Sequence, residues 1–88
     1  MSQHPYFGAP PLREPTPASR VGTLRGKRLI LSTPWGFVYD MRAASDRQLD
    51  VEGRQVVEVC TDEDYYRWMF TSVRPGTETY DISLVWVE

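Results

Sequence analysis

Hydrophobic and polar positions alternate along most of the chain after residue 27, as they do in β-strands with one buried face. Turn-forming residues such as Pro34, Gly36, Gly53 and the Pro75-Gly76 pair interrupt the alternation at short intervals. We identify no segment with the hydrophobic period of an amphipathic helix. The pattern predicts six strands, at residues 28–33, 37–42, 48–51, 55–61, 65–72 and 79–87.

The predicted strands are joined by short polar segments, including residues 43–47 and the acidic run 62–64, both interpreted as turns. Parallel strands need crossovers of a dozen residues or more, so these short connections indicate antiparallel neighbours. We therefore predict an all-β fold, an antiparallel meander that forms a curved sheet or a small barrel.

Residues 1–20 contain five of the seven prolines, which disfavours both a helix and a central strand there. We predict that residues 1–23 form a proline-rich extended arm and that residues 24–88 form the β domain. Tyr6, Phe7 and Leu12 can attach the arm to its own domain or to a neighbouring subunit, and the alternative is disorder of at least the first ten residues.

Large aromatic side chains are numerous for a chain of 88 residues, and the alternation places many of them on one predicted face. They can simply fill the core, which a small domain needs for stability. On the concave face of a curved sheet they can also line an apolar ligand pocket, or a dimer interface if the sheet stays open. The candidate ligand-binding residues are Phe37, Tyr39, Met41, Tyr66, Trp68, Phe70, Tyr80 and Trp86.

Composition and charge indicate the cellular location and the kinds of partner that we expect for the protein. One cysteine cannot form an internal disulfide, no apolar run is long enough to span a membrane, and the N-terminus lacks the features of a secretory signal, so a cytoplasmic location is expected. Residues 1–28 carry five basic residues and one acidic residue, and residues 29–88 carry five basic and eleven acidic residues. Without a lysine-rich cluster we expect no nucleic-acid partner.

The residues of common catalytic and metal sites are scarce. His4, the only histidine, lies in the proline-rich segment, and Cys60 has no histidine or lysine nearby in the sequence to activate it. Cys60 alternates with Val56 and Glu58, which predicts an exposed or interfacial thiol. We therefore expect no catalytic residue, no metal and no cofactor, and lean against an enzyme.

Residues 26–30 (GKRLI) followed by 36–41 (GFVYDM) resemble the opening hairpin of the calycin-like proteins related to phenolic acid decarboxylase and to MoaF-type molybdenum cofactor biosynthesis proteins. The order of the later strands, with the ending Asp81-Ile82-Ser83-Leu84, extends the resemblance over about residues 24–87. It implies a curved sheet with a ligand pocket.

The decarboxylase residues of that family are not retained. Leu31 and Thr33 stand where the family has a Tyr-x-Tyr pair, its glutamate falls near Ser72 or Val73, and Arg54 is only a loose counterpart of its arginine. The resemblance therefore implies the fold and a pocket without the decarboxylase activity.

The sequence favours non-catalytic binding of a small apolar or aromatic molecule by an aromatic-lined concavity, in a protein that forms a homodimer and has no membrane partner. The first alternative is a protein–protein interaction or structural module, an SH3-like small barrel with an arm-mediated dimer. The second alternative is a minimal cyclase or isomerase in which an aromatic cavity positions the substrate.

Overall fold

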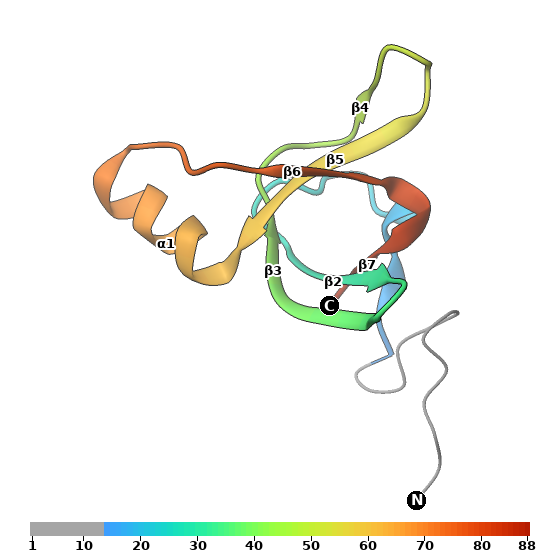
Figure 1. Cartoon of the computed structure of the whole chain (residues 1–88), viewed down its shortest axis with the longest axis horizontal. Coiled ribbons are helices and arrows are strands. Elements are labelled where there is room, and N and C mark those ends of the chain that lie inside the picture. The colour runs from blue at the N-terminus through green and yellow to red at the C-terminus, as the bar shows by residue number, and fades with distance from the viewer. Residues whose placement is uncertain (1–13) are drawn as a thin grey trace, which may run out of the picture.

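The computed structural model describes residues 14–88 and shows the predicted all-β architecture, an antiparallel sheet that curls into a half-barrel (Figure 1). The main strands follow the order β7-β2-β3-β5-β6 across the sheet, and two short strands, β1 and β4, pair with β7 and β5. The strands are β1 (Thr16–Pro17), β2 (Arg28–Thr33), β3 (Gly36–Ala43), β4 (Gln48–Leu49), β5 (Gln55–Thr61), β6 (Glu78–Asp81) and β7 (Val85–Val87).

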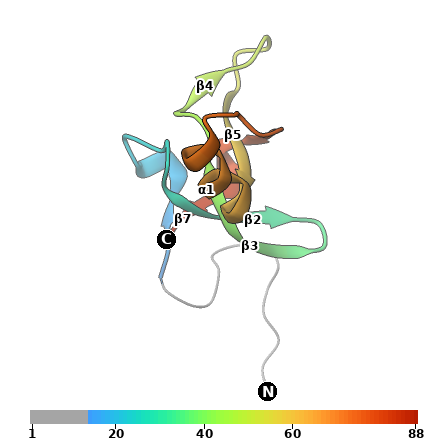
Figure 2. The same cartoon turned by 90° about the vertical axis from the view of Figure 1, so that its left-hand side faces the viewer.

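Three helical segments accompany the sheet: the 3₁₀ turns η1 (Ala18–Arg20) and η2 (Ile82–Leu84), and the helix α1 (Asp62–Thr71). Figure 2 shows α1 in front of the sheet when the molecule is viewed from the side on which the helix projects in Figure 1. The helix therefore lies outside the curl, between β5 and β6 in sequence.

The strand predicted at residues 65–72 is wrong, because these residues belong mostly to α1. Thr61 caps the helix by accepting a hydrogen bond from the Asp64 amide through its side chain, at 3.0 Å. Asp62, Glu63 and Asp64 place negative charge in the first turn, where the helix dipole favours it. The acidic run interpreted as a turn is thus the start of a helix, which ends at Ser72 in the left-handed conformation.

A β-bulge in β3 changes which side chains face the core. Leu29 pairs with Met41 and Leu31 pairs with Val38. Between these two pairs, β3 therefore contains one more residue than β2. Asp40 takes up the extra residue with a φ of 61°, a conformation that aspartate tolerates better than most residues. The predicted face of Phe37, Tyr39 and Met41 is therefore broken at Asp40.

The single strand predicted at residues 79–87 is also divided. It consists of β6 and β7 with the turn η2 between them, where the Asp81 carboxylate accepts hydrogen bonds from the amide and hydroxyl of Ser83. After this turn Val85 and Val87 are buried, while Leu84 is exposed and Trp86 is half-buried. The inward face predicted for Trp86 is therefore wrong.

The core inside the curl is aliphatic. It is formed by Ala18, Leu24, Leu29, Leu31, Met41, Ala43, Val57, Val59, Ile82, Val85 and Val87, with Val21 and Tyr80 packed against it. Because Ala18 belongs to this cluster and Val21 packs against it, part of the segment predicted as an arm packs on the body. The predictions for Tyr6, Phe7 and Leu12 lie outside the described residues.

The segment that leads into β2 is held by Asp46. Its carboxylate accepts hydrogen bonds from the amides of Leu24 at 2.8 Å and Arg25 at 3.0 Å, and these donors lower the pKa of Asp46. Leu24 is fully buried, so this contact fixes one side of the core. The polar residues 43–47, interpreted only as a turn, thus include a structural anchor.

We predict that Asp46→Asn weakens the acid dependence of stability. A pKa lowered by folding means that the ionised form favours the folded state, so its contribution is present above pH ~4 and is lost as pH falls through the folded pKa. In urea titrations between pH 7 and pH 2, Asp46→Asn should be less stable at pH 7 and lose less stability in acid. The control Glu78→Gln, at an exposed position, should keep the wild-type slope. An unchanged slope in Asp46→Asn would contradict the prediction.

We also predict that Gly26→Ala is more destabilising than Gly53→Ala. Both glycines have positive φ, 82° and 83°, so alanine costs about 1–2 kcal/mol at either position. Only at Gly26 would the new Cβ lie 2.9 Å from the Tyr65 hydroxyl oxygen, whereas nothing lies within 4 Å at Gly53. The urea unfolding free energies of the two variants measure the additional cost of displacing Tyr65, and equal losses would rule it out.

Candidate functional site

Helix α1 is attached to the half-barrel mainly by arginine side chains, and none of its residues is buried. The guanidinium carbons of Arg25 and Arg74 lie 5.7 Å and 5.5 Å from the centre of the Trp68 ring. Tyr65 meets Trp68 edge to face, with 5.9 Å between ring centres. Such cation–π and aromatic contacts contribute modestly when they are exposed to water, so the helix is docked without an apolar core of its own.

Arg42 of β3 connects the helix to the sheet. Its Nε donates to Asp62 at 2.6 Å, and its two terminal nitrogens donate to the Gly26 carbonyl and the Tyr66 hydroxyl, each at 2.8 Å. The hydrogen bond to Asp62 is the main cause of a raised Arg42 pKa. The guanidinium also lies over the Tyr66 ring, 5.1 Å from its centre. One cation thus fixes the start of α1 against β3 and against the segment before β2.

A groove runs between β3 and the first turns of α1. This β3–α1 groove is lined by residues 38–41 of β3 together with Thr61, Asp62, Glu63 and Tyr66, and has a volume of about 490 Å³. Val38, Tyr39 and Tyr66 are the exposed apolar and aromatic residues of its lining, and Asp40, Asp62 and Glu63 are its acidic residues. Aromatic rings beside carboxylates form a site suited to cations and to rigid apolar groups.

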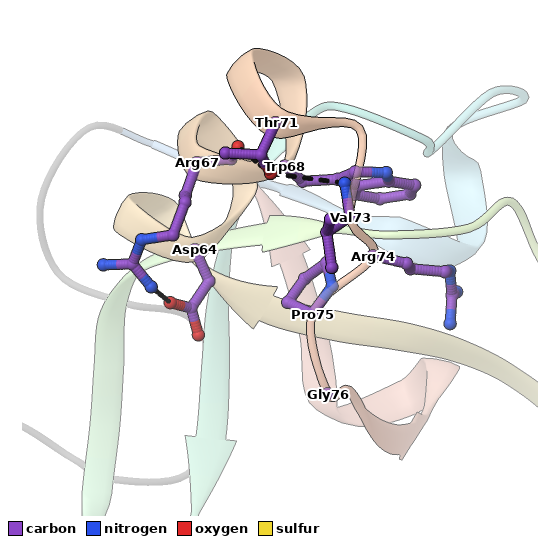
Figure 3. Close-up of a pocket in the computed structure, with 8 residues that line it drawn as sticks. All are labelled: Asp64, Arg67, Trp68, Thr71, Val73, Arg74, Pro75 and Gly76. Carbon is purple, nitrogen blue, oxygen red and sulfur yellow. Dashed lines mark hydrogen bonds and ion pairs between the residues drawn. The ribbon is translucent and has the colours of Figure 1, made fainter.

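A second hollow lies on the other side of α1 and is shown in Figure 3. This α1–loop hollow, of about 310 Å³, is lined by Asp64, Arg67, Trp68 and Thr71 of the helix and by residues 73–76. The Thr71 hydroxyl donates to the Arg67 carbonyl and accepts from the Val73 amide, which turns the chain back along the helix. Arg67 is paired with Asp64 at 3.0 Å.

Arg74 extends this attachment to the sheet. It donates to Glu58 of β5 at 2.7 Å, and Thr77 donates to the same carboxylate oxygen at 2.9 Å. These bonds lower the pKa of Glu58, with the bond from Arg74 as the larger cause. The loop after α1 is therefore held on β5, and Trp68 lies between that loop and Arg25.

Apolar side chains remain exposed on α1 and on the segment that follows it. Tyr66 is 47% exposed, Met69 51%, Phe70 87% and Val73 70%. We call these four residues the outer patch. Aromatic residues and methionine are enriched at protein interfaces, and clustered exposed apolar side chains mark such interfaces more often than isolated ones do.

The structure separates the candidate ligand-binding residues. Met41 belongs to the core and Tyr80 packs against it, while Phe37 and Trp86 are half-buried outside the core cluster. Tyr66, Trp68 and Phe70 lie on α1 rather than on a strand of the curl. The β3–α1 groove brings together Tyr39, Met41 and Tyr66 alone among the eight. The aromatic-lined concave face expected from the alternation is therefore not formed, because the concave face is aliphatic.

Several features of the site were not anticipated from the sequence. Arg25, Arg42 and Arg74 hold α1 on the half-barrel. The sequence alone does not indicate this role, because it depends on the fold placing these arginines against Tyr65, Tyr66 and Trp68. The expectation that Cys60 is exposed or interfacial is not met within the single chain, where it is 4% exposed. Burial raises the pKa of the Cys60 thiol.

Among residues 14–88, no group of three or more histidine, cysteine, aspartate and glutamate side chains is placed to hold a metal ion. In the same part of the chain, no helix is both long and apolar enough to cross a membrane. Compared with known proteins, the chain matches no family model, no curated protein and no solved structure. The calycin-like relationship thus stays a prediction.

We predict that Trp68→Ala loosens α1, whereas Phe70→Ala does not. Two cation–π contacts at exposed sites together contribute about 1–2 kcal/mol, and both are lost with the indole ring. Phe70, on the same helix, is 87% exposed and should change stability by less than about 0.5 kcal/mol. Urea unfolding and the amide hydrogen exchange of residues 62–71 measure the effects. Equal exchange rates in the two variants would contradict this account of how α1 is held.

Proposed function

We propose that the protein is a protein–protein interaction module that binds its partner through α1. The observation that carries the proposal is the outer patch: Tyr66, Met69 and Phe70 of a helix with no buried residue, and Val73 just after that helix, remain exposed to solvent. A helix that served only to connect β5 and β6 would not need this apolar surface. The single curled sheet of short strands also fits the SH3-like small barrel of this proposal.

The charges around the outer patch indicate the kind of partner. The first turn of α1 contains three acidic residues, its last turn contains no basic residue, and residues 29–88 carry six more acidic than basic residues. A partner segment with apolar side chains flanked by basic ones complements this surface, since opposite charges steer association and apolar anchors supply affinity.

Small-molecule binding stays a prediction that the fold supports less well. The aliphatic side chains inside the curl occupy the face on which the aromatic pocket was expected. The two hollows beside α1 lie outside the curl, and neither has the lining of apolar and aromatic residues alone that was expected for the pocket. The distribution of the aromatics therefore favours the interaction module.

The proposal is tested by replacing Phe70 with a photo-reactive benzoylphenylalanine and irradiating cell extract. Trp35, 91% exposed in the turn between β2 and β3, is the matched control position. We expect one protein to be captured from position 70 and not from position 35. The purified partner should then bind the wild-type chain, with affinity reduced about thirtyfold by Phe70→Ala, as for an interface hot spot worth about 2 kcal/mol.

Two results would contradict the interaction module. The first is a purified partner that binds wild type and Phe70→Ala equally. The second is a thermal stabilisation of the chain by hydrophobic small molecules that Trp68→Ala removes, which would instead support ligand binding.

A further inference from the structure

The first part of β3 has a strand neighbour on one side only. Among residues 14–88, residues 36–39 pair with β2 alone, whereas β5 pairs with β3 at Met41, Arg42 and Ala43. The reason is that β5 ends at Thr61, opposite Met41, and the chain then leaves the sheet in α1 (Figure 1). In the described part of the chain, no strand therefore occupies the place where β5 would continue along β3.

Two residues of this free edge direct their backbone groups away from β2. Thr33 pairs with Gly36 across a two-residue turn, and the Thr33 hydroxyl donates to the Gly36 carbonyl at 2.7 Å. Along an antiparallel strand, every second residue directs its N–H and C=O away from the paired strand. Counted from Gly36, these residues are Phe37 and Tyr39. An edge with unpaired backbone groups is a template for one more strand.

The β3–α1 groove lies directly beside this edge. Val38 and Tyr39 line it from β3, and Tyr66 lines it from α1. A strand added to β3 would lie about 4.8 Å away from it, on the side of the groove. Peptides that bind by strand addition gain affinity from main-chain hydrogen bonds and specificity from the surface that their alternate side chains contact. The edge provides the hydrogen-bonding groups, and the groove provides the contact surface.

The bulge at Asp40 limits the length of the free edge. It interrupts the regular pairing of β3 after Tyr39, so four residues, 36–39, are open to an added strand. Short edges and bulges are features that prevent whole sheets from joining edge to edge. The edge is therefore suited to a short extended segment rather than to the sheet of another protein.

The charge of the groove indicates which segment it accepts. Asp40, Asp62 and Glu63 are among the eight residues that line it, and none of the eight is basic. The side chains of Asp40 and Glu63 are 71% and 83% exposed, and their pairs with Arg28 and Arg67 contribute little in water. Both carboxylates can thus accept a further cation. A second copy would bring its own acidic groove to this edge, which like charges disfavour.

We propose that residues 36–39 accept a short extended segment of a partner protein as an added β-strand. Its apolar side chains lie against Tyr39 and Tyr66, and its flanking basic side chains lie beside Asp40 and Glu63. The site goes beyond the proposed function, because the groove contains none of Met69, Phe70 and Val73 of the outer patch and the main-chain contact is to β3 rather than to α1.

The test uses the full chain and three synthetic nine-residue peptides. Each has the centre valine-threonine-valine-threonine-valine, flanked on both sides by two lysines, two serines or two glutamates. The lysine peptide should shift the amide NMR signals of residues 37–41 and 61–66. At saturation it should slow the hydrogen exchange of the Phe37 and Tyr39 amides about tenfold, since they gain partners, whereas the Val38 amide, which faces β2, should change less.

The charge preference is measured from the affinities of the three peptides at low salt. The lysine peptide should bind about tenfold more tightly than the serine peptide, and the glutamate peptide should bind most weakly. In the double variant Asp40→Asn, Glu63→Gln, the lysine peptide should lose this advantage. Asparagine tolerates the positive φ of position 40. The matched control Glu78→Gln, at an exposed position of β6 outside the groove, should keep the full ratio.

Five outcomes would overturn the inference. If the Phe37 and Tyr39 amides already exchange as slowly as Val38 without peptide, the edge is covered by the chain itself or by a second copy. Signal shifts without slower exchange would mean contact through side chains alone. Equal affinity for the three peptides would exclude the charge preference, and absence of binding would exclude the site.

The fifth outcome separates this site from the outer patch. Shifts confined to Met69, Phe70 and Val73 would assign the peptide to the outer patch and exclude strand addition at β3. The proposed function fails separately, in the capture and affinity measurements at Phe70.

Discussion

Arg42 is the side chain on which the arrangement of the sheet and the helix depends. It leaves β3 beside the bulge at Asp40 and binds the Gly26 carbonyl, the Asp62 carboxylate and the Tyr66 hydroxyl. Its side chain is only 19% exposed, and a charge so placed is tolerated because each donor group has an acceptor. Removing any one acceptor would leave a partly buried donor without a partner, so the segment before β2, the end of β3 and the start of α1 hold one another in place.

The strands could be predicted from the sequence because one side chain in two is apolar and the turns carry proline and glycine. The segments at residues 28–33 and 55–61 coincide with β2 and β5. The prediction failed where local hydrogen bonds override alternation. In α1, the order tyrosine, tyrosine, arginine, tryptophan, methionine and phenylalanine reads as alternation only if the cap at Thr61 and the acidic turn after it are ignored.

That failure explains most of what the sequence missed at the site. Once residues 65–72 are taken as a strand, Tyr66, Trp68 and Phe70 fall on the face predicted for Phe37 and Tyr39, and a single aromatic concavity follows. The bulge at Asp40 and the turn η2 each shift the facing of side chains by one position, which is enough to send Val85 and Val87 inward and Trp86 away. The pattern of hydrophobic positions does not predict where a bulge lies, because a bulge depends on how two strands pair.

The use of aliphatic residues inside and aromatic residues outside has a physical basis in the size of the half-barrel. A curl of a few short strands encloses little volume, and leucine, valine, isoleucine and alanine fill it at high density without leaving a polar group unpaired. Tyrosine and tryptophan carry polar atoms that are satisfied more easily at the surface, where the Tyr66 hydroxyl accepts a hydrogen bond from Arg42 and the Tyr65 and Trp68 rings contact arginine side chains through their faces.

An isolated helix of ten residues is marginal in water, and α1 gains little from burial. Its order depends on the contacts of Arg25, Arg42 and Arg74, and its exposed residues Met69 and Phe70 are not part of the core cluster. Any ligand that binds the ordered helix stabilises that state by mass action, in proportion to its preference for it. The surfaces of α1 therefore belong to the part of the fold whose stability is most responsive to binding.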